Sequence, residues 1–498
     1  MSRKSPKRNT GLVVALILLI LVFIAGSALM IKLSLDLVDT APSTRPGNSS
    51  SIVLPNSGGD TTAETEPPPP ETTLPEPEHV VSTATIVSTG DLLMHKPVID
   101  TGLVGGSYNF DSIFKYIRDD VTAADYAVAN LEVTLAGTET GIPYQGYPRF
   151  NCPDAIVTSA KDAGFDMLLT ANNHSYDTGL AGFKRTLEVT RDTGLETLGT
   201  YTSADETHWA VEEINGIQVG MICYTYATGV TDGRPMLNGN AAISEAGLCN
   251  YFTYNNLDAF YSELDGYLKE MKEAGAEATV IYLHWGDENQ LQANANQKQM
   301  AQKICDLGVD VIIGGHPHVV QPMELLTSTT DPDRKTVCLY SMGNAVSNQR
   351  QGNLSAISTA HTEDGVLFSI TFSKYSDGTV YLESTDLLPV WVHRRNDGTG
   401  NEYNMLPLHL DQADTWAETF NIKDATVQAA KNSHARTMAI IGSGLTDCQN
   451  WLTQQKEARE QYYYDLVHNP DKVATQPTEA VTEASTEAST ETTAAPAV

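Results

Sequence analysis

The sequence is poor in cysteine, and its cysteines are widely spaced. The 498 residues include six cysteines, at positions 152, 223, 249, 305, 338 and 448. Because no Cys-x-x-Cys pair occurs, a zinc site held by thiolates is not expected. Cys223, Cys305 and Cys338 lie inside apolar runs typical of strands or helices. We therefore expect buried free thiols rather than the disulfides that an oxidising exterior would permit.

The sequence also has little positive charge. Lys and Arg together number 31 against 62 Asp and Glu, which gives a formal net charge of -31. A chain this acidic is repelled by nucleic-acid phosphates and by anionic membrane surfaces. We therefore expect no nucleic-acid partner.

Charge of either sign is missing from Leu12 to Ile31, and this run is nearly all apolar. At about 1.5 Å rise per residue, a helix of this length spans about 30 Å, the hydrocarbon thickness of a bilayer. Basic residues precede the run, and this bias keeps the N-terminus in the cytoplasm. We predict an uncleaved single-pass anchor in the cell membrane, with the rest of the chain extracellular. A cleaved signal peptide, with small residues at positions 25–28, is the alternative.

Two further segments lack the apolar residues that a core requires. From Asp39 to Glu78 the chain is rich in Pro, Thr, Ser, Gly and Glu, and from Asn469 it repeats Thr, Glu, Ala and Ser. We expect both segments to be disordered. The predicted organisation is a basic cytoplasmic N-terminus (1–11), a transmembrane anchor (12–33), a disordered linker (34–81), a folded domain (82–392), a mainly helical C-terminal extension (393–467) and a disordered acidic tail (468–498).

Strand-like and helix-like segments alternate through the folded region, which predicts an α/β fold. Strands are expected at residues 85–88, 126–129, 167–170, 218–224, 279–283, 309–313, 337–340, 366–372 and 379–383. Helices are expected at 112–118, 155–163, 182–193, 257–274 and 297–307. The last strands follow one another without helices, so we expect a mixed sheet. After residue 410 the pattern is helical again.

Polar residues follow several predicted strands at the point where each strand ends. They are Asp91, then Asn130 and Glu132, then Asn173 and His174, then His284, and finally His316 and His318 after Gly314-Gly315. Strands of one sheet would place these ends side by side, and α/β folds bind ligands at the carboxyl edge of the sheet. If the segment from 316 to 318 is extended, both imidazoles point the same way.

These side chains suit a divalent cation, because carboxylate, amide oxygen and imidazole are its usual ligands. A bridging carboxylate can hold two ions about 3.5–4 Å apart, which activate a shared water and clamp a phosphate-like group. A free histidine beside them can protonate the leaving oxygen. Each motif alone is also an ordinary turn or helix cap. Their occurrence in order, each after a strand, favours a metal site.

The motifs GDLLMH, NLE, NNHSYDTG, HWGDE, GGHPHVVQ and YSMGN resemble the CapA family of poly-γ-glutamate capsule biosynthesis proteins. That family is itself similar to the calcineurin-like metallophosphoesterases, and the resemblance covers about residues 84–386. It implies a four-layer α/β/β/α sandwich with one or two divalent metal ions (Zn, Mn or Fe) at the strand ends. It also implies a membrane-anchored, extracellular role in capsule production, with polyglutamate synthetase subunits and the anionic polymer as partners.

The resemblance extends to single residues. The positions that match metal ligands are Asp91, Glu132, Asn173, His284, His316 and His318, and His174 matches the histidine that protonates the leaving group. Arg149, Gln321 and Asn344 match positions near the site and are expected to contact substrate; a surface salt bridge explains Arg149 equally well. Two positions depart from the phosphoesterase pattern. Leu93 replaces a usual histidine, which His95 could supply only if the loop bends back, and Glu132 replaces a usual aspartate.

Three functions stay open from the sequence. The first is a metal-dependent hydrolase of phosphoester-like or amide-like bonds in the cell envelope, favoured because Asn173 and His174 have no evident scaffold role. The second is a non-catalytic subunit that assembles the polyglutamate machinery or handles its polymer, favoured by the missing first-motif histidine. The third is an extracellular nucleotidase, which needs an aromatic pair to stack on a base. The sequence identifies no such pair.

Overall fold

The computed structural model describes residues 79–139, 141–353, 358–396, 401–469 and 472. The predicted membrane anchor, nearly all of the linker and nearly all of the acidic tail lie outside these residues. In the described part of the chain, no helix has both the length and the apolar character needed to cross a bilayer.

The first sheet has eight strands, in the order β19-β18-β17-β1-β4-β5-β6 with β16 paired to β1. Strands β1, β4, β5 and β6 are parallel, and β17, β18 and β19 continue the sheet in antiparallel fashion. The bounds are β1 Val80–Leu92, β4 Tyr126–Asn130, β5 Met167–Leu169, β6 Glu196–Leu198, β16 Asn344–Val346, β17 Asp364–Tyr375, β18 Val380–Asn396 and β19 Asn401–Pro407.

The second sheet has seven strands, in the order β11-β8-β12-β13-β15-β14 with β7 paired to β8. Strands β11, β8, β12, β13 and β15 are parallel, whereas β7 and β14 are antiparallel to their neighbours. The bounds are β7 Ala210–Ile214, β8 Ile217–Tyr226, β11 Tyr251–Phe252, β12 Ala278–His284, β13 Val311–Gly315, β14 Met323–Thr327 and β15 Lys335–Leu339. Two short hairpins, β2–β3 (Leu103–Val104, Ser107–Tyr108) and β9–β10 (Gly229–Thr231, Arg234–Met236), project from the loops.

The two sheets share one hydrophobic core. Ile86 of the first sheet and Ile313 of the second belong to it, whereas Val87 and Ile312, the neighbouring residues in the same strands, belong to two outer cores that include helices. Successive side chains of a strand point to opposite faces. Both faces of β1 and β13 are therefore buried, which explains why a continuous apolar run predicts β13.

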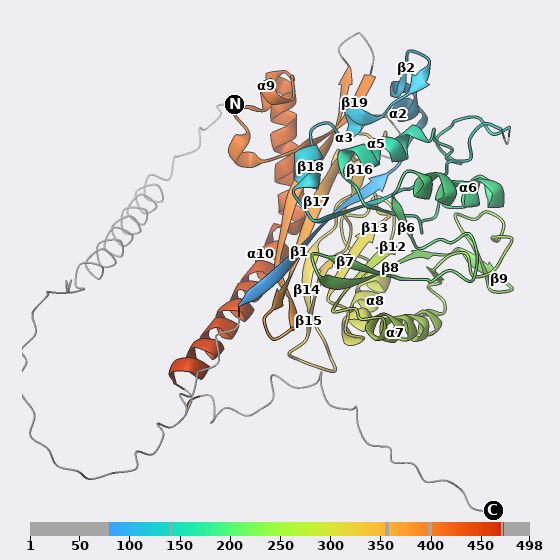
Figure 1. Ribbon diagram of the computed structural model, residues 1–498. Coiled ribbons are helices and arrows are strands. Elements are labelled where there is room, and N and C mark those ends of the chain that lie inside the picture. Colours follow the sequence, from blue (N-terminus) through green and yellow to red (C-terminus); the bar gives the residue numbers. More distant parts are fainter. Residues whose placement is uncertain (1–78, 140, 354–357, 397–400, 470–471, 473–498) are drawn as a thin grey trace, which may run out of the picture. The chain divides into compact units, whose positions relative to one another are not determined.

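Helices cover the outer faces of the sheets (Figure 1). The first sheet packs against α2 Lys96–Thr101, α3 Asp111–Phe114, α4 Arg118–Thr122 and α5 Ala155–Ala163, and the second against α7 Leu257–Glu273 and α8 Ala295–Asp306. Helix α6 Gly179–Asp192 contributes to the shared core. Helix α8 begins at a capping box, because Asn294 and Gln297 exchange side-chain and backbone hydrogen bonds.

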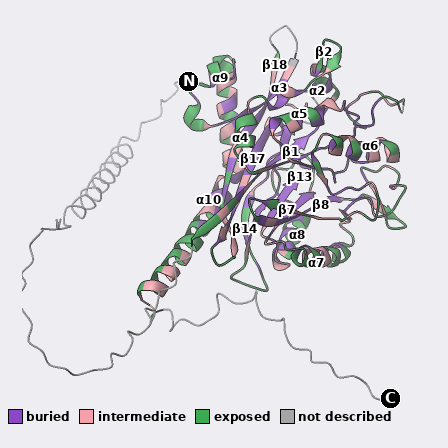
Figure 2. Ribbon diagram, viewed as in Figure 1, coloured by how far each residue is buried: buried purple, intermediate pink, exposed green. Residues whose placement is uncertain are grey.

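A long C-terminal helix, α10 Asp424–His468, packs against strands of both sheets (Figure 1). Ile441 and Leu445 reach the shared core. Gly444 permits the close approach, since a Cβ atom there would lie 1.9 Å from the Met323 carbonyl oxygen. The end of α10 beyond Leu452 is mostly exposed, as Figure 2 shows. The short α9 Trp416–Thr419 and the 3-10 turns His361–Glu363 and Leu410–Gln412 complete the fold.

Several predictions are confirmed. The protein is α/β with mixed sheets, and the chain after residue 410 is mainly helical. All six cysteines are buried free thiols. The sheet strands that were not predicted are β6, β7, β11, β14, β16 and β19, and most of them are short or lie at a sheet edge; the strands of the two hairpins were not predicted either. Strand β18 crosses the expected limit at residue 392 and pairs with β19, which lies beyond it, and the domain boundaries themselves stay a prediction.

Candidate metal centre

The polar strand ends converge, but they come from two sheets rather than one. Asp91 ends β1 and Glu132 follows β4 in the first sheet, whereas His284 ends β12 in the second. The expectation that one sheet would align them is therefore wrong. Because the sheets face each other, the carboxyl ends of their parallel strands meet at one place. All these side chains are at most 5% exposed.

Glu132 has the least satisfied carboxylate among the described residues of this cluster. Both of its oxygens are buried without a hydrogen-bond partner. Its Oε1 lies 3.4 Å from His284 Nε2 and 3.8 Å from His318 Nε2. Burial, together with the charge of Asp91, raises the pKa of Glu132 well above its usual range. A buried carboxylate without donors is unfavourable, and a cation would compensate it. This residue therefore fits a metal.

Asp91 is held from several sides. Its Oδ2 lies 3.0 Å from His318 Nδ1, and its Oδ1 accepts a hydrogen bond of 2.7 Å from Asn130 Nδ2. Burial acts to raise the pKa of Asp91, but the bond and charge of His318 outweigh it and lower the pKa. Burial likewise opposes protonation of His318, and Asp91 nevertheless raises its pKa. Asn344 fixes His318 from the other side. The Asn344 Oδ1 lies 3.2 Å from His318 Nδ1, and the Asn344 Nδ2 donates a hydrogen bond to the His318 carbonyl oxygen.

His284 and Asn173 contact each other across the two sheets. His284 Nε2 lies 2.8 Å from Asn173 Oδ1. Burial lowers the pKa of His284 to about 3, so the imidazole is neutral. Neutral imidazole is the form that binds a metal.

His316 is placed by a strained backbone. Its φ is 92° and that of His318 is 55°, in the left-handed region that few non-glycine residues adopt. The segment is therefore not extended, and the expectation that alternation aligns the two imidazoles is wrong. Strand β13 continues through Gly315 rather than ending at residue 313, and a Cβ at Gly315 would lie 3.1 Å from Asp91 Oδ1. His316 Nδ1 is buried without a partner, and burial lowers the pKa of His316 well below its usual value.

Two overlapping groups in this cluster could hold a metal ion. One consists of Glu132, His316 and His318, and the other of Asp91, Glu132 and His284; within each group the ligand atoms lie within 4.8 Å of one another. Glu132 belongs to both, so it stands where a bridging ligand would be needed. We call these residues, with Asn173, the metal cluster.

His174 lies beside the metal cluster, next to Asn173 in the chain. Its Nδ1 is 2.8 Å from Asp177 Oδ2, which also accepts a hydrogen bond of 2.7 Å from the Phe150 backbone N–H. The Phe150 ring packs edge-on against the imidazole at 4.6 Å between centroids. A carboxylate that fixes one ring nitrogen orients the other. Asp177 lies in the NNHSYDTG motif, but the sequence alone indicates no role for it.

The structure places the three residues expected to contact substrate in different settings. Asn344 is buried against His318, and Gln321 is buried with its amide donating to the carbonyls of Gln290 and Gln292. Arg149 is exposed and forms no ion pair with any described residue. Substrate contact by all three stays a prediction. His95 accepts a hydrogen bond from the Asn348 N–H and lies outside both groups that could hold a metal.

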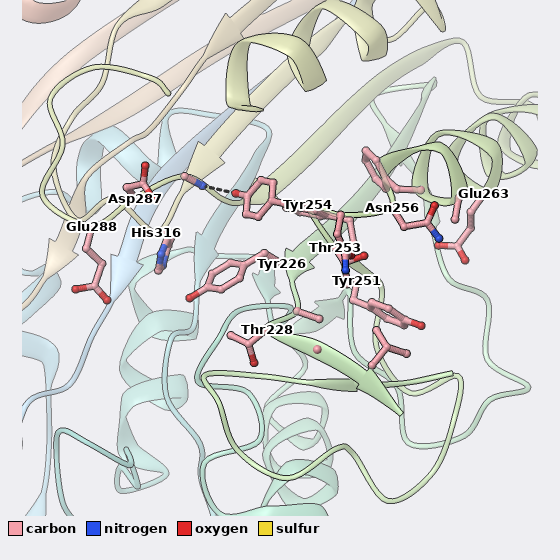
Figure 3. Close-up of a pocket in the computed structure, with 18 residues that line it drawn as sticks. Tyr226, Thr228, Tyr251, Thr253, Tyr254, Asn256, Glu263, Asp287, Glu288 and His316 are labelled. Carbon is pink, nitrogen blue, oxygen red and sulfur yellow. Dashed lines mark hydrogen bonds between the residues drawn. The ribbon is translucent and has the colours of Figure 1, made fainter. Parts of the chain in front are cut away.

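A cavity of about 870 Å³ adjoins the metal cluster at His316 (Figure 3). We call it the tyrosine cavity, because it is lined by Tyr226, Tyr251 and Tyr254 together with Phe252, Phe260, residues 227–230, 253, 255, 256, 259, 263 and 286–288. Tyr226 packs against His316 at 4.8 Å and against Tyr254 at 6.4 Å between ring centroids. The sequence identified no such aromatic pair, because residues 226 and 254 lie on separate segments and neither belongs to a motif.

A comparison with known protein families matches the region that contains the metal cluster. Residues 85–349 match the family described as "Bacterial capsule synthesis protein PGA_cap". The chain is 25% identical over 268 residues to "Capsule biosynthesis protein CapA" of Bacillus anthracis, covering 53% of this chain and 60% of that protein. It is 27% identical over 264 residues to "PGA biosynthesis protein CapA" of Bacillus subtilis (strain 168), covering 52% and 62%. The chain thus spans about 60% of the length of these curated relatives.

Proposed function

Because this chain belongs to the bacterial capsule synthesis family PGA_cap, we propose that it acts in capsule or poly-γ-glutamate biosynthesis as a metal-dependent hydrolase of phosphoester-like or amide-like bonds. The match to the family covers the segments that carry the metal cluster, from Asp91 to His318. We also propose that the fold is the four-layer sandwich of the metallophosphoesterases.

The observation that carries the hydrolase proposal is the Glu132 carboxylate, buried between three histidines with neither oxygen hydrogen-bonded. Asp91, Glu132, Asn173, His284, His316 and His318 would hold one or two divalent ions of Zn, Mn or Fe. When bound, such ions polarise a phosphoryl or carbonyl oxygen and lower the pKa of a water ligand.

The chain's own residues supply positioning and proton transfer. Asp177 holds His174 Nδ1, so that Nε2 is free to donate a proton to a leaving oxygen. Asn130 and Asn344 fix the orientations of Asp91 and His318. Arg149, whose guanidinium pairs with no carboxylate of the described residues, precedes Phe150, which packs on His174, and would attract an anionic substrate.

A non-catalytic subunit that assembles the polymer machinery is the alternative. The Leu93 substitution at the first motif supports it, because His95 lies outside both groups that could hold a metal. A nucleotidase is the third candidate, but Tyr226 and Tyr254 do not support it, because these two rings stack on each other beside the metal cluster and leave no slot for a base between them.

We further propose that residues 12–33 anchor the protein in the cell membrane and that the folded domain faces outward, towards polyglutamate synthetase subunits and the anionic polymer. Protease added to intact cells should then release a fragment that starts in the linker between residues 34 and 81. A folded domain that stays protected until the cells are lysed would contradict this topology.

The deciding experiment is metal analysis of the purified protein, followed by an activity screen on phosphoesters and γ-glutamyl polymer. We expect one or two divalent ions per chain and hydrolysis of one substrate class. Bound metal without hydrolysis of either class would favour the assembly role. Protein that binds no divalent ion would contradict the hydrolase proposal.

A further inference from the structure

Apart from His316, the residues that line the tyrosine cavity have no part in the chemistry proposed above. Its carboxyl groups are those of Glu263, Asp287 and Glu288, and no lysine or arginine is among the described residues that line it. Figure 3 shows Glu288 and His316 at one end and Tyr251 and Glu263 at the other. A cavity of about 870 Å³ is within the size range of small-molecule sites, roughly 300–1,000 Å³.

The charges of this lining exclude an anionic occupant. Glu288 is exposed and forms no hydrogen bond or ion pair with the described residues. A γ-glutamyl carboxylate or a phosphate placed beside it would meet like charge, and no lysine or arginine among the described lining residues would compensate it. The cavity therefore does not fit the anionic polymer itself.

The aromatic and polar groups of the cavity suit a ring that carries hydroxyl groups. Hydrogen-bonding side chains are spread along the lining, including Thr253, Asn255 and Asn256, and carboxylates accept hydrogen bonds from hydroxyls. The tyrosine rings offer apolar faces to the C–H face of a sugar. A simple amine presents a single cationic centre and would leave most of these groups unused.

The tyrosine pair itself disfavours a nucleobase. The ring centroids of Tyr226 and Tyr254 are 6.4 Å apart with planes at 26°. A base between two rings needs two carbon contacts of about 3.5–4.0 Å, and therefore about 7–8 Å between the ring planes. The rings already stack on each other, and a ligand can use only their outer faces and edges.

We infer that the tyrosine cavity binds a neutral sugar unit and holds it next to His316. This binding needs no metal. Its meaning for catalysis rests on the proposed function: the enzyme would act on a glycan-linked group, with the sugar in the cavity and the bond to be cleaved at the metal cluster.

The test is binding of neutral trisaccharides to the purified full-length protein. Maltotriose and tri-N-acetylchitotriose are titrated by calorimetry and by saturation-transfer NMR, beside a γ-glutamate trimer, adenosine and 1,5-diaminopentane. We expect at least one trisaccharide to bind and the γ-glutamate trimer not to bind. Tyr251→Ala should weaken sugar binding by about tenfold or more. Tyr251→Phe, which keeps the ring, should retain most of it.

An exposed tyrosine outside the cavity provides the control. Tyr464 lies on α10, and Tyr464→Ala should bind sugar as the parent protein does. Absence of binding by both trisaccharides, tighter binding of adenosine or the diamine, or equal loss in Tyr251→Ala and Tyr464→Ala would overturn the inference. Metal content of the same samples separates the two proposals. Intact metal without sugar binding overturns only this inference, whereas sugar binding without metal overturns only the hydrolase.

Discussion

The metal cluster and the tyrosine cavity meet at His316 but are built differently. Every residue of the cluster follows or ends a strand, is at most 5% exposed, and most are fixed by a neighbouring side chain. The cavity is lined mainly by residues 226–230, 251–260 and 286–288, and its carboxylates at 287 and 288 are exposed. The cluster is therefore positioned by the ends of core strands, whereas the cavity is lined by loop residues together with the end of β8, the short strands β9 and β11, and helix α7.

This difference separates two roles. Groups that bind a metal or transfer protons must be held rigidly, and strand ends provide that rigidity. Groups that select a ligand can lie on loops, which vary without disturbing the core. Changes in the cluster should therefore alter metal content and stability, whereas changes in the cavity should alter only ligand choice.

The largest expected effect is that of His316→Ala. It removes a predicted ligand, so metal content should fall and the stabilisation that metal gives the folded state should disappear. That stabilisation is about 2.7 kcal/mol when free metal is a hundredfold above its dissociation constant. The measurement is the difference in unfolding free energy between metal-loaded and chelator-treated protein, beside metal analysis.

His409 is the matched control for this change, because it also contacts a carboxylate, that of Asp120 at 2.7 Å, but lies outside the cluster. His409→Ala should keep its metal content. The difference in unfolding free energy between metal-loaded and chelator-treated protein should also be unchanged. If His316→Ala kept a normal metal content, the prediction that this cluster binds a metal would be wrong.

A second change separates proton transfer from metal binding. His174→Ala should leave metal content near normal and, if the protein is a hydrolase, lower turnover by about 10²–10⁴-fold. Asp177→Asn should lower turnover less, by about 10–100-fold, because it only misorients His174. Metal loss in His174→Ala equal to that in His316→Ala would make His174 a ligand. Normal capsule output in His174→Ala, with output lost in His316→Ala, would favour the assembly role.

A third prediction concerns the pH dependence of the metal-free protein. Folding lowers the pKa values of His284 and His316, so between about pH 6.5 and 4.5 the unfolded chain binds two protons that the folded chain does not. Folding raises the pKa of Glu132, so the folded chain holds one proton that the unfolded chain lacks. These three groups together contribute a difference of one proton, a fall in stability of about 1.4 kcal/mol per pH unit on acidification. His95 and His393, whose pKa values burial lowers to about 4, act in the same direction, and Asp364, whose pKa burial raises to about 6, opposes them.

Two variants test whether the histidines and Glu132 change the pH dependence of stability in opposite directions. His284→Asn should flatten this slope, because it removes one of the two histidines. Glu132→Gln should steepen it, because it removes the opposing carboxyl group. The measurement is denaturant unfolding in chelator at pH 6.5, 5.5 and 4.5. If the unfolding free energy changed equally with pH in both variants, these groups would not titrate as their burial implies.

The smallest expected effect is that of Glu288→Gln, a change on the exposed lining of the tyrosine cavity. It breaks no hydrogen bond with a described residue, so unfolding free energy should stay within about 0.5 kcal/mol of the parent. Metal content should also be unchanged. A clear drop in metal content would mean that the cavity and the cluster are one site rather than two.

The sequence by itself identified the residues of the metal cluster and most of the core strands. Both follow from local chemistry: buried strands are continuous apolar runs, and Asp91, Glu132, His284, His316 and His318 stand where such runs end. Membership of the capsule synthesis family follows from the same motifs. The Arg149 salt bridge, by contrast, was left open by the sequence and is absent from the described structure.

Only the tertiary structure decided how these residues meet. Two sheets, not one, bring the strand ends together, and left-handed backbone at His316 and His318, not extended chain, aims their imidazoles. The structure also assigned Asp177 to His174 and paired Tyr226 with Tyr254. None of this could be predicted from spacing, because these contacts depend on the packing of one sheet on the other and on loop backbone angles. Short sequence motifs determine neither the packing of the sheets nor the backbone angles of the loops.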